Sequence, residues 1–90
     1  MSAAKDEIAV ERVQTGVRIE KRMLKVAKGL AEYLDMSLGD LLEGVLLHAF
    51  EGKPAFSPAT RERIKMLREL YDLKLTAADA HRLRDGADGK

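Results

Sequence analysis

The 90-residue chain contains no cysteine. This absence excludes a disulfide framework, a thiolate metal site and a cysteine nucleophile. Long apolar runs are also missing, and none approaches the roughly 20 residues that a membrane-spanning helix needs. Residues 1–11 carry acidic side chains and no apolar stretch, so we expect no secretory signal there. These absences predict a cytoplasmic protein without a membrane partner.

Groups that could carry catalysis are scarce. The sequence has two histidines, His48 and His81. His48 and Glu51 lie one turn apart near the end of a predicted helix, but two ligands make no recognised metal site. The helix dipole favours a histidine at that end in any case. Since the chain has no nucleophile–base pairing and no phosphate-binding glycine loop, we predict that it is not an enzyme and has no metal or other cofactor.

The composition is that of an ordinary soluble domain, with 46% hydrophobic and 34% charged residues. A domain of this size buries a modest share of its surface and often gains stability by oligomerising. The net charge of +1 neither requires nor excludes a polyanionic partner, because local patches decide that matter. We predict a flexible N-terminal arm at 1–12, a folded domain at 13–51 and a helical extension at 52–90.

Residues 13–19 show the alternation of a β-strand. β-branched and apolar residues alternate there with other types, in the order Val13, Gln14, Thr15, Gly16, Val17, Arg18 and Ile19. This period of two gives a strand with two unlike faces. It is the only strand candidate in the chain, and its backbone groups need a hydrogen-bonding partner. We therefore expect it to pair with the same segment of a second copy.

Two amphipathic helices are predicted next, at 20–34 and 37–50. The first has an apolar stripe at spacings of three and four, formed by Met23, Leu24, Ala27, Leu30, Ala31 and Leu34. Asp35 tolerates the left-handed conformation that ends helices, and Ser37 is a favourable N-cap for the second helix. The second helix is apolar on more than one side, through Leu41, Leu42, Val45, Leu46, Ala49 and Phe50. Such a helix needs burial against more than one neighbour, which again favours a dimer.

A helical hairpin is predicted for the C-terminal extension. Residues 51–56 indicate a linker, and Ser57 followed by proline is typical of a helix start. The helix that follows carries an apolar stripe, made of Ile64, Leu67, Leu70 and Tyr71. The spacing of Thr76 and Asp79 predicts a capping box and a short last helix that ends near Gly86. These apolar groups are too many to leave in water, so we expect them to cover a partner or another part of the protein.

The order of strand, helix, short turn and helix resembles the ribbon-helix-helix family of DNA-binding proteins (the MetJ/Arc superfamily). The resemblance covers about residues 13–50 and is carried by the strand pattern Gln14-x-Gly16-x-Arg18, the stripe of the first helix, and Asp35-Met36-Ser37 before the second. It implies a mainly α-helical fold in which one N-terminal strand from each of two chains pairs antiparallel across a homodimer. The resulting ribbon enters the major groove of double-stranded DNA.

The resemblance also implies roles for individual residues. Arg18 can donate two hydrogen bonds to guanine and Gln14 can pair with adenine, while Gly16, the third outward position, offers no side chain. The phosphate contact at the start of the second helix matches Ser37, Leu38 and Gly39, and the first helix adds Lys21 and Arg22. The dimer core is expected to contain Val13, Thr15, Val17, Ile19, Leu24, Leu42, Val45 and Leu46.

Two functions follow from this reading. The first is a sequence-specific transcriptional regulator, expected to be a repressor, which associates with the nucleoid when it is bound to DNA. The alternative is an antitoxin or another interaction module, because many relatives in the family use a C-terminal extension to occupy a toxin. In that case the partner surface consists of Ile64, Leu67, Leu70 and Tyr71. A third use of the same surface is assembly of dimers into a larger oligomer.

Overall fold

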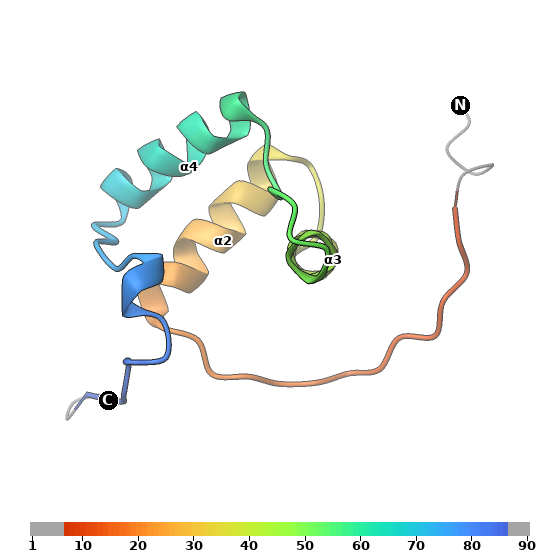
Figure 1. The fold of residues 1–90 in the computed structure, drawn as a ribbon, viewed down its shortest axis with the longest axis horizontal. Coiled ribbons are helices and arrows are strands. Elements are labelled where there is room, and N and C mark those ends of the chain that lie inside the picture. Colours follow the sequence, from red (N-terminus) through yellow and green to blue (C-terminus); the bar gives the residue numbers. More distant parts are fainter. Residues whose placement is uncertain (1–6, 87–90) are drawn as a thin grey trace.

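The computed structural model describes residues 7–86 of the chain. Within them lie three α-helices, α2 (Lys21–Tyr33), α3 (Leu38–Phe50) and α4 (Pro58–Leu70), and a 3-10 turn, η1 (Ala77–Asp79). Helix α2 is central, because it contacts both α3 and α4. Figure 1 shows α4 running beside α2, while α3 crosses the far end of α2 and is seen nearly end-on. None of the described helices has both the length and the apolar character to cross a bilayer.

The predicted ribbon-helix-helix fold is contradicted, because residues 7–86 contain no β-strand. Residues 7–20 instead form an extended segment that runs past α3 and leads into α2 (Figure 1). The backbone groups of residues 7–19 make no backbone hydrogen bond with the rest of the described chain. The alternation of apolar and polar side chains favours an extended backbone, but it does not supply a second strand. Without that second strand the backbone hydrogen bonds of a β-sheet cannot form. The regular secondary structure of residues 7–86 is therefore helical throughout, and an extended segment precedes it.

The helices that follow this segment begin and end close to their predicted positions. Glu20 caps α2 by accepting a hydrogen bond from the Met23 N–H at 2.8 Å. Asp35 ends that helix with a φ of 58°, in the left-handed region that was expected for it. The Ser37 hydroxyl accepts a hydrogen bond from the Asp40 N–H at 3.0 Å, so the predicted N-cap of α3 is confirmed.

The predicted C-terminal hairpin is wrong, since the second helix is absent from the described residues. Helix α4 is present, with Ser57 as its N-cap. The Thr76 N–H does donate to Asp79 Oδ2 at 2.9 Å, but the turn ends at Ala80, whose φ of −58° and ψ of 140° are not helical. Residues 80–86 are exposed and have no apolar stripe to bury. A helix this short is marginal without packing, so the capping residues stabilise a single turn only.

The core lies where α2 meets its two neighbours. Its buried residues are few: Val26, Leu30, Ala31, Leu41 and Leu73. Half-buried side chains pack around it, including Phe56, Ile64 and Leu67. Gly29 allows α4 to approach α2 closely, because a Cβ at this position would lie 3.0 Å from Leu67 Cδ2. The C-terminal extension thus completes the core of its own chain.

Candidate nucleic-acid interface

The extended segment is held against α3 by Arg12. Its Nε and Nη2 atoms lie 2.9 and 2.8 Å from the two carboxylate oxygens of Glu43, and Nη2 lies 3.8 Å from Asp40 Oδ1. The hydrogen bond from Arg12, followed by its charge, lowers the pKa of Glu43 below its ordinary value. The carboxylate raises the pKa of Arg12 in return, again mainly through the hydrogen bond. The contacts with Glu43 and Asp40 place the start of the segment beside the first turns of α3.

The three residues predicted to read bases all lie in the exposed part of this segment. Gln14 and Gly16 are exposed. A Cβ at Gly16 would have no atom within 4 Å, so nothing in the single chain requires glycine there. Arg18 is also exposed, but it is paired: its Nη2 lies 2.7 Å from Asp85 Oδ2. An arginine that could donate to guanine therefore faces a carboxylate of the C-terminal segment.

The predicted phosphate site at the start of α3 is intact as a helix N-terminus. Ser37 uses its hydroxyl to cap the Asp40 N–H. The N–H groups of Leu38 and Gly39 lie in the first turn, where an α-helix provides no internal partner. Asp40 adds a negative charge to the same turn, but Arg12 lies beside it. These residues could bind an anion through backbone N–H groups and the helix dipole.

The two basic candidates on α2 are placed differently. Lys21 is exposed and makes no ion pair with the described residues. Arg22 donates from Nη1 to the Asp72 carbonyl oxygen at 3.0 Å, and the same atom lies 3.6 Å from Asp72 Oδ2. A hydrogen bond from Lys74, 2.8 Å away, and then its charge lower the pKa of Asp72. Arg22 thus joins the start of α2 to the turn after α4, whereas Lys21 is available to a ligand.

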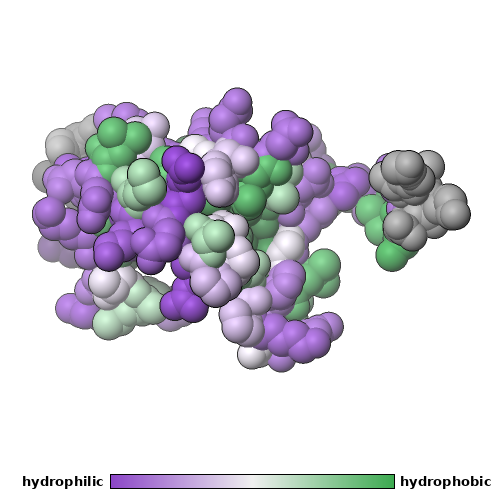
Figure 2. Space-filling model, turned by 90° about the horizontal axis from the view of Figure 1, so that it is seen from above, coloured by the Kyte–Doolittle hydropathy of each residue, from purple (hydrophilic) through white to green (hydrophobic). Residues whose placement is uncertain are grey.

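None of the eight residues predicted for the dimer core is buried in the single chain. Val13 is 80% exposed, Val17 73% and Leu46 51%. Thr15, Ile19 and Leu42 are exposed as well, and Leu24 and Val45 are half-buried. Helix α3 also exposes Leu47 and Phe50, which were not assigned to the dimer core. Figure 2 shows hydrophobic patches interrupting the hydrophilic surface on the face that it presents.

The predicted partner surface on the C-terminal extension is partly used within the chain. Ile64 and Leu67 are half-buried against the core. Tyr71 is half-buried too, with the Lys25 ammonium 5.8 Å from its ring centroid. Leu70 remains 70% exposed. The four residues therefore do not form one continuous free surface.

Sequence reasoning missed Arg12, Glu43 and Asp85. Arg12 was assigned to the flexible arm, of which residues 1–6 lie outside the described part of the chain. Arg12 and Glu43 are 31 residues apart, and Arg18 and Asp85 lie near opposite ends of the described residues. Neither pairing has a local sequence signal, because helical charge pairs are recognised only at spacings of three and four. Among residues 7–86 no group of three potential metal ligands lies together.

Comparison of the chain with protein-family models, with curated proteins and with solved structures found no match. The functional interpretation therefore depends on the geometry and chemistry of the residues described above.

Proposed function

We propose that this protein is a sequence-specific DNA-binding transcriptional regulator, a repressor, that acts as a homodimer. The proposal depends on the exposure of the extended segment before α2. Its backbone hydrogen-bonding groups are unpaired within the described chain, and Gln14 and Arg18 are exposed on it. Because these backbone and side-chain groups are exposed, they are available to form hydrogen bonds with base edges in a groove of DNA.

The side chains available in the segment match the chemistry of base recognition. A guanidinium can donate two hydrogen bonds to guanine O6 and N7, and a carboxamide can pair with adenine N6 and N7. Arg18 and Gln14 supply these two groups. Phosphate contacts would come from the free N–H groups of Leu38 and Gly39 and from Lys21. Contacts to phosphates would position the chain, and the segment would read the sequence.

Dimerisation is supported by the apolar side chains that the single chain leaves exposed, because the buried core of a homodimer interface is more apolar than the rest of a protein surface. The exposed apolar side chains of α3, Leu42, Leu46 and Leu47, are well suited to meet their counterparts in a second copy. In this proposal the dimer resides in the cytoplasm and joins the nucleoid when it binds DNA.

The alternative of an antitoxin or similar interaction module has less support. It needs Ile64, Leu67, Leu70 and Tyr71 as a partner surface, but three of these are half-buried within their own chain. A toxin-binding tail is often disordered until it binds, whereas α4 is a capped helix packed on α2. We therefore place DNA binding first.

The test is selection from a random duplex library by the full chain. Wild-type protein should enrich a short inverted repeat, because a symmetric dimer reads two equivalent half-sites. Arg18→Ala should lose the preference at one base position in each half-site. Arg84→Ala is the matched control, since Arg84 is also an exposed arginine and makes no ion pair with the described residues. Failure of the folded wild-type protein to enrich any sequence would refute the proposal.

A further inference from the structure

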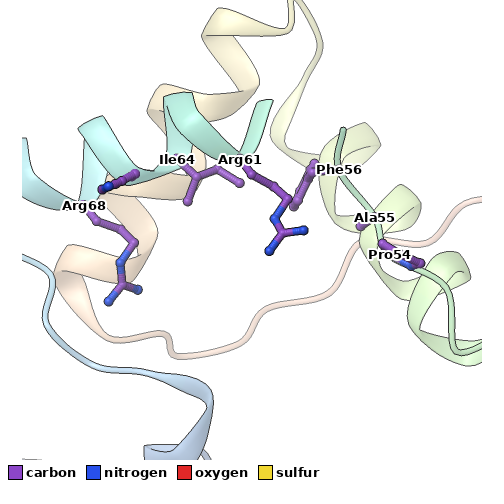
Figure 3. Close-up of a pocket in the computed structure, with 7 residues that line it drawn as sticks. Pro54, Ala55, Phe56, Arg61, Ile64 and Arg68 are labelled. Atoms are coloured by element: carbon purple, nitrogen blue, oxygen red, sulfur yellow. The ribbon is translucent and has the colours of Figure 1, made fainter. Parts of the chain in front are cut away.

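A cationic groove with an apolar floor lies between α4 and the linker that precedes it. Its volume is about 530 Å³, within the range of small-molecule sites. Phe56 of the linker and Ile64 of α4 supply apolar surface, and Arg61, Lys65 and Arg68 supply positive charge. Figure 3 shows the guanidinium groups of Arg61 and Arg68 on the same side of α4, with Ile64 between them.

Helical spacing places these charges together. Positions 61, 64, 65 and 68 are separated by three, four and seven residues, so they share one face of α4. Along the helix axis the seven residues from Arg61 to Arg68 span about 10 Å. The groove is therefore long enough to contact the charged group and the apolar body of one ligand at the same time.

The three cations make no ion pair with a carboxylate of residues 7–86. Arg63 lies on another face of α4 and, unlike these three cations, has a partner: its guanidinium lies over the Tyr33 ring, 4.3 Å from the centroid. Several other cations of the chain, such as Arg12 and Arg22, are paired with acids. Three unpaired cations beside an apolar surface thus form a local patch of one sign in a chain whose net charge is only +1.

We propose that this groove binds a small organic anion that combines a carboxylate with an apolar chain or ring. The carboxylate would accept hydrogen bonds from Arg61 or Arg68, which suit planar, two-oxygen groups. The apolar body would cover Ile64 and Phe56 and remove their surface from water. A phosphate of the DNA backbone uses the charge but has no apolar part, so the floor of the groove favours an amphipathic ligand. This site is separate from the proposed DNA-binding segment and does not depend on it.

The experiment titrates the full-length protein with octanoate and follows backbone amide signals by NMR. Saturable shifts are expected at residues 55–68. Acetate carries the charge without the chain, and 1-octanol carries the chain without the charge, so each should bind at least about tenfold more weakly. Octanoate that gives no saturable shifts, or 1-octanol that binds equally well, would overturn the proposal.

Variants locate the site. Arg61→Gln combined with Arg68→Gln should weaken octanoate binding at least about tenfold, because both guanidinium donors are lost while the side-chain stems stay. The control is Lys28→Gln combined with Arg84→Gln, which removes two charges from exposed positions outside the groove. Circular dichroism should show equal helix content in both variants. Equal octanoate affinity in the two variants would show that the anion binds elsewhere and would refute the assignment, as would shifts confined to α3.

Discussion

Arg18 Nη2 lies 2.7 Å from Asp85 Oδ2, so the arginine proposed to read DNA is paired with a carboxylate from the other end of the described chain. Both side chains are highly exposed, at 86% and 69%. Exposed pairs contribute little to stability, because water and salt screen them and the side chains lose freedom. The ion pair is therefore weak enough for DNA to displace Asp85 from Arg18. Breaking the pair still costs some free energy, which reduces the affinity for DNA.

Removal of this carboxylate should strengthen DNA binding. We expect Asp85→Asn to raise the affinity of the wild-type site by up to about fivefold, since the competing charge is removed. Arg18→Ala should weaken binding by about 1–3 kcal/mol. Fluorescence anisotropy at fixed salt measures both effects. In the Arg18→Ala background, Asp85→Asn should have no further effect on affinity. An equal gain in both backgrounds would mean that Asp85 acts by general charge rather than through Arg18.

Lys21 and Arg22 are neighbours in sequence but should behave differently when replaced. Lys21→Ala should reduce the slope of the salt dependence of DNA binding by about two units, one for each chain of the dimer, and leave thermal stability unchanged, because each free ammonium contacts a phosphate. Arg22→Ala should lower the melting temperature slightly, because it removes the hydrogen bond to the Asp72 carbonyl oxygen that joins α2 to the end of α4, whereas the exposed ion pair with Asp72 adds little. Binding at several salt concentrations and thermal denaturation distinguish the two. The same salt slope in Lys21→Ala and wild type would contradict a phosphate contact.

Local sequence signals predicted most of the helical structure. Ser37 and Ser57 form their caps within a few residues of sequence, and Asp35 adopts its left-handed conformation where the apolar stripe of α2 ends. Such features depend on neighbours along the chain, so propensity and capping rules apply directly. The prediction of a last helix failed for the related reason that the Thr76–Asp79 pair stabilises only one turn when no apolar stripe follows it.

The candidate site was less predictable, because it depends on contacts between distant residues. The alternation from Val13 to Ile19 predicts a β-strand, and this prediction is wrong, because a strand requires a pairing partner that residues 7–86 do not contain. The two ion pairs that the segment makes, Arg12 with Glu43 and Arg18 with Asp85, join residues far apart in the sequence, so they depend on tertiary structure alone. Exposure of Gln14 and Arg18 was anticipated, whereas the acidic partner of Arg18 was not.

If the chain forms a homodimer through α3, one substitution on α3 should prevent dimerisation and leave the fold of the single chain intact. Leu46 is 51% exposed in the single chain, so Leu46→Glu should preserve the helical core and disrupt the interface by placing a charge in it. Light scattering after size exclusion should give twice the 10.0-kDa chain mass for the wild type and a smaller mass for the variant.

Leu70→Glu is the matched control, because Leu70 is an equally apolar exposed residue on α4. Because association of two folded chains stabilises the folded state, the wild-type melting temperature should rise with protein concentration. A wild-type monomer whose melting temperature is independent of concentration would contradict the proposal.

The contact of Arg12 with Glu43 should make the position of the extended segment depend on pH. The pKa of Glu43 is lowered in the folded protein by the hydrogen bond and charge of Arg12, so this state favours the carboxylate. The contribution of the contact is therefore complete above the ordinary glutamate pKa of 4.5 and is lost as the pH falls through the lowered value.

An NMR titration of the Glu43 carboxyl carbon should give a midpoint below 4.5, and Arg12→Gln should bring it back toward that value. Arg84→Gln should leave the Glu43 midpoint where it is in the wild type, since Arg84 is exposed and the pKa of Glu43 is lowered by Arg12 alone. Signals of residues 10–14 should shift together with the Glu43 carboxyl, because protonation releases the segment from α3. A Glu43 midpoint that is the same with and without Arg12 would show that the segment is not held in this way in solution.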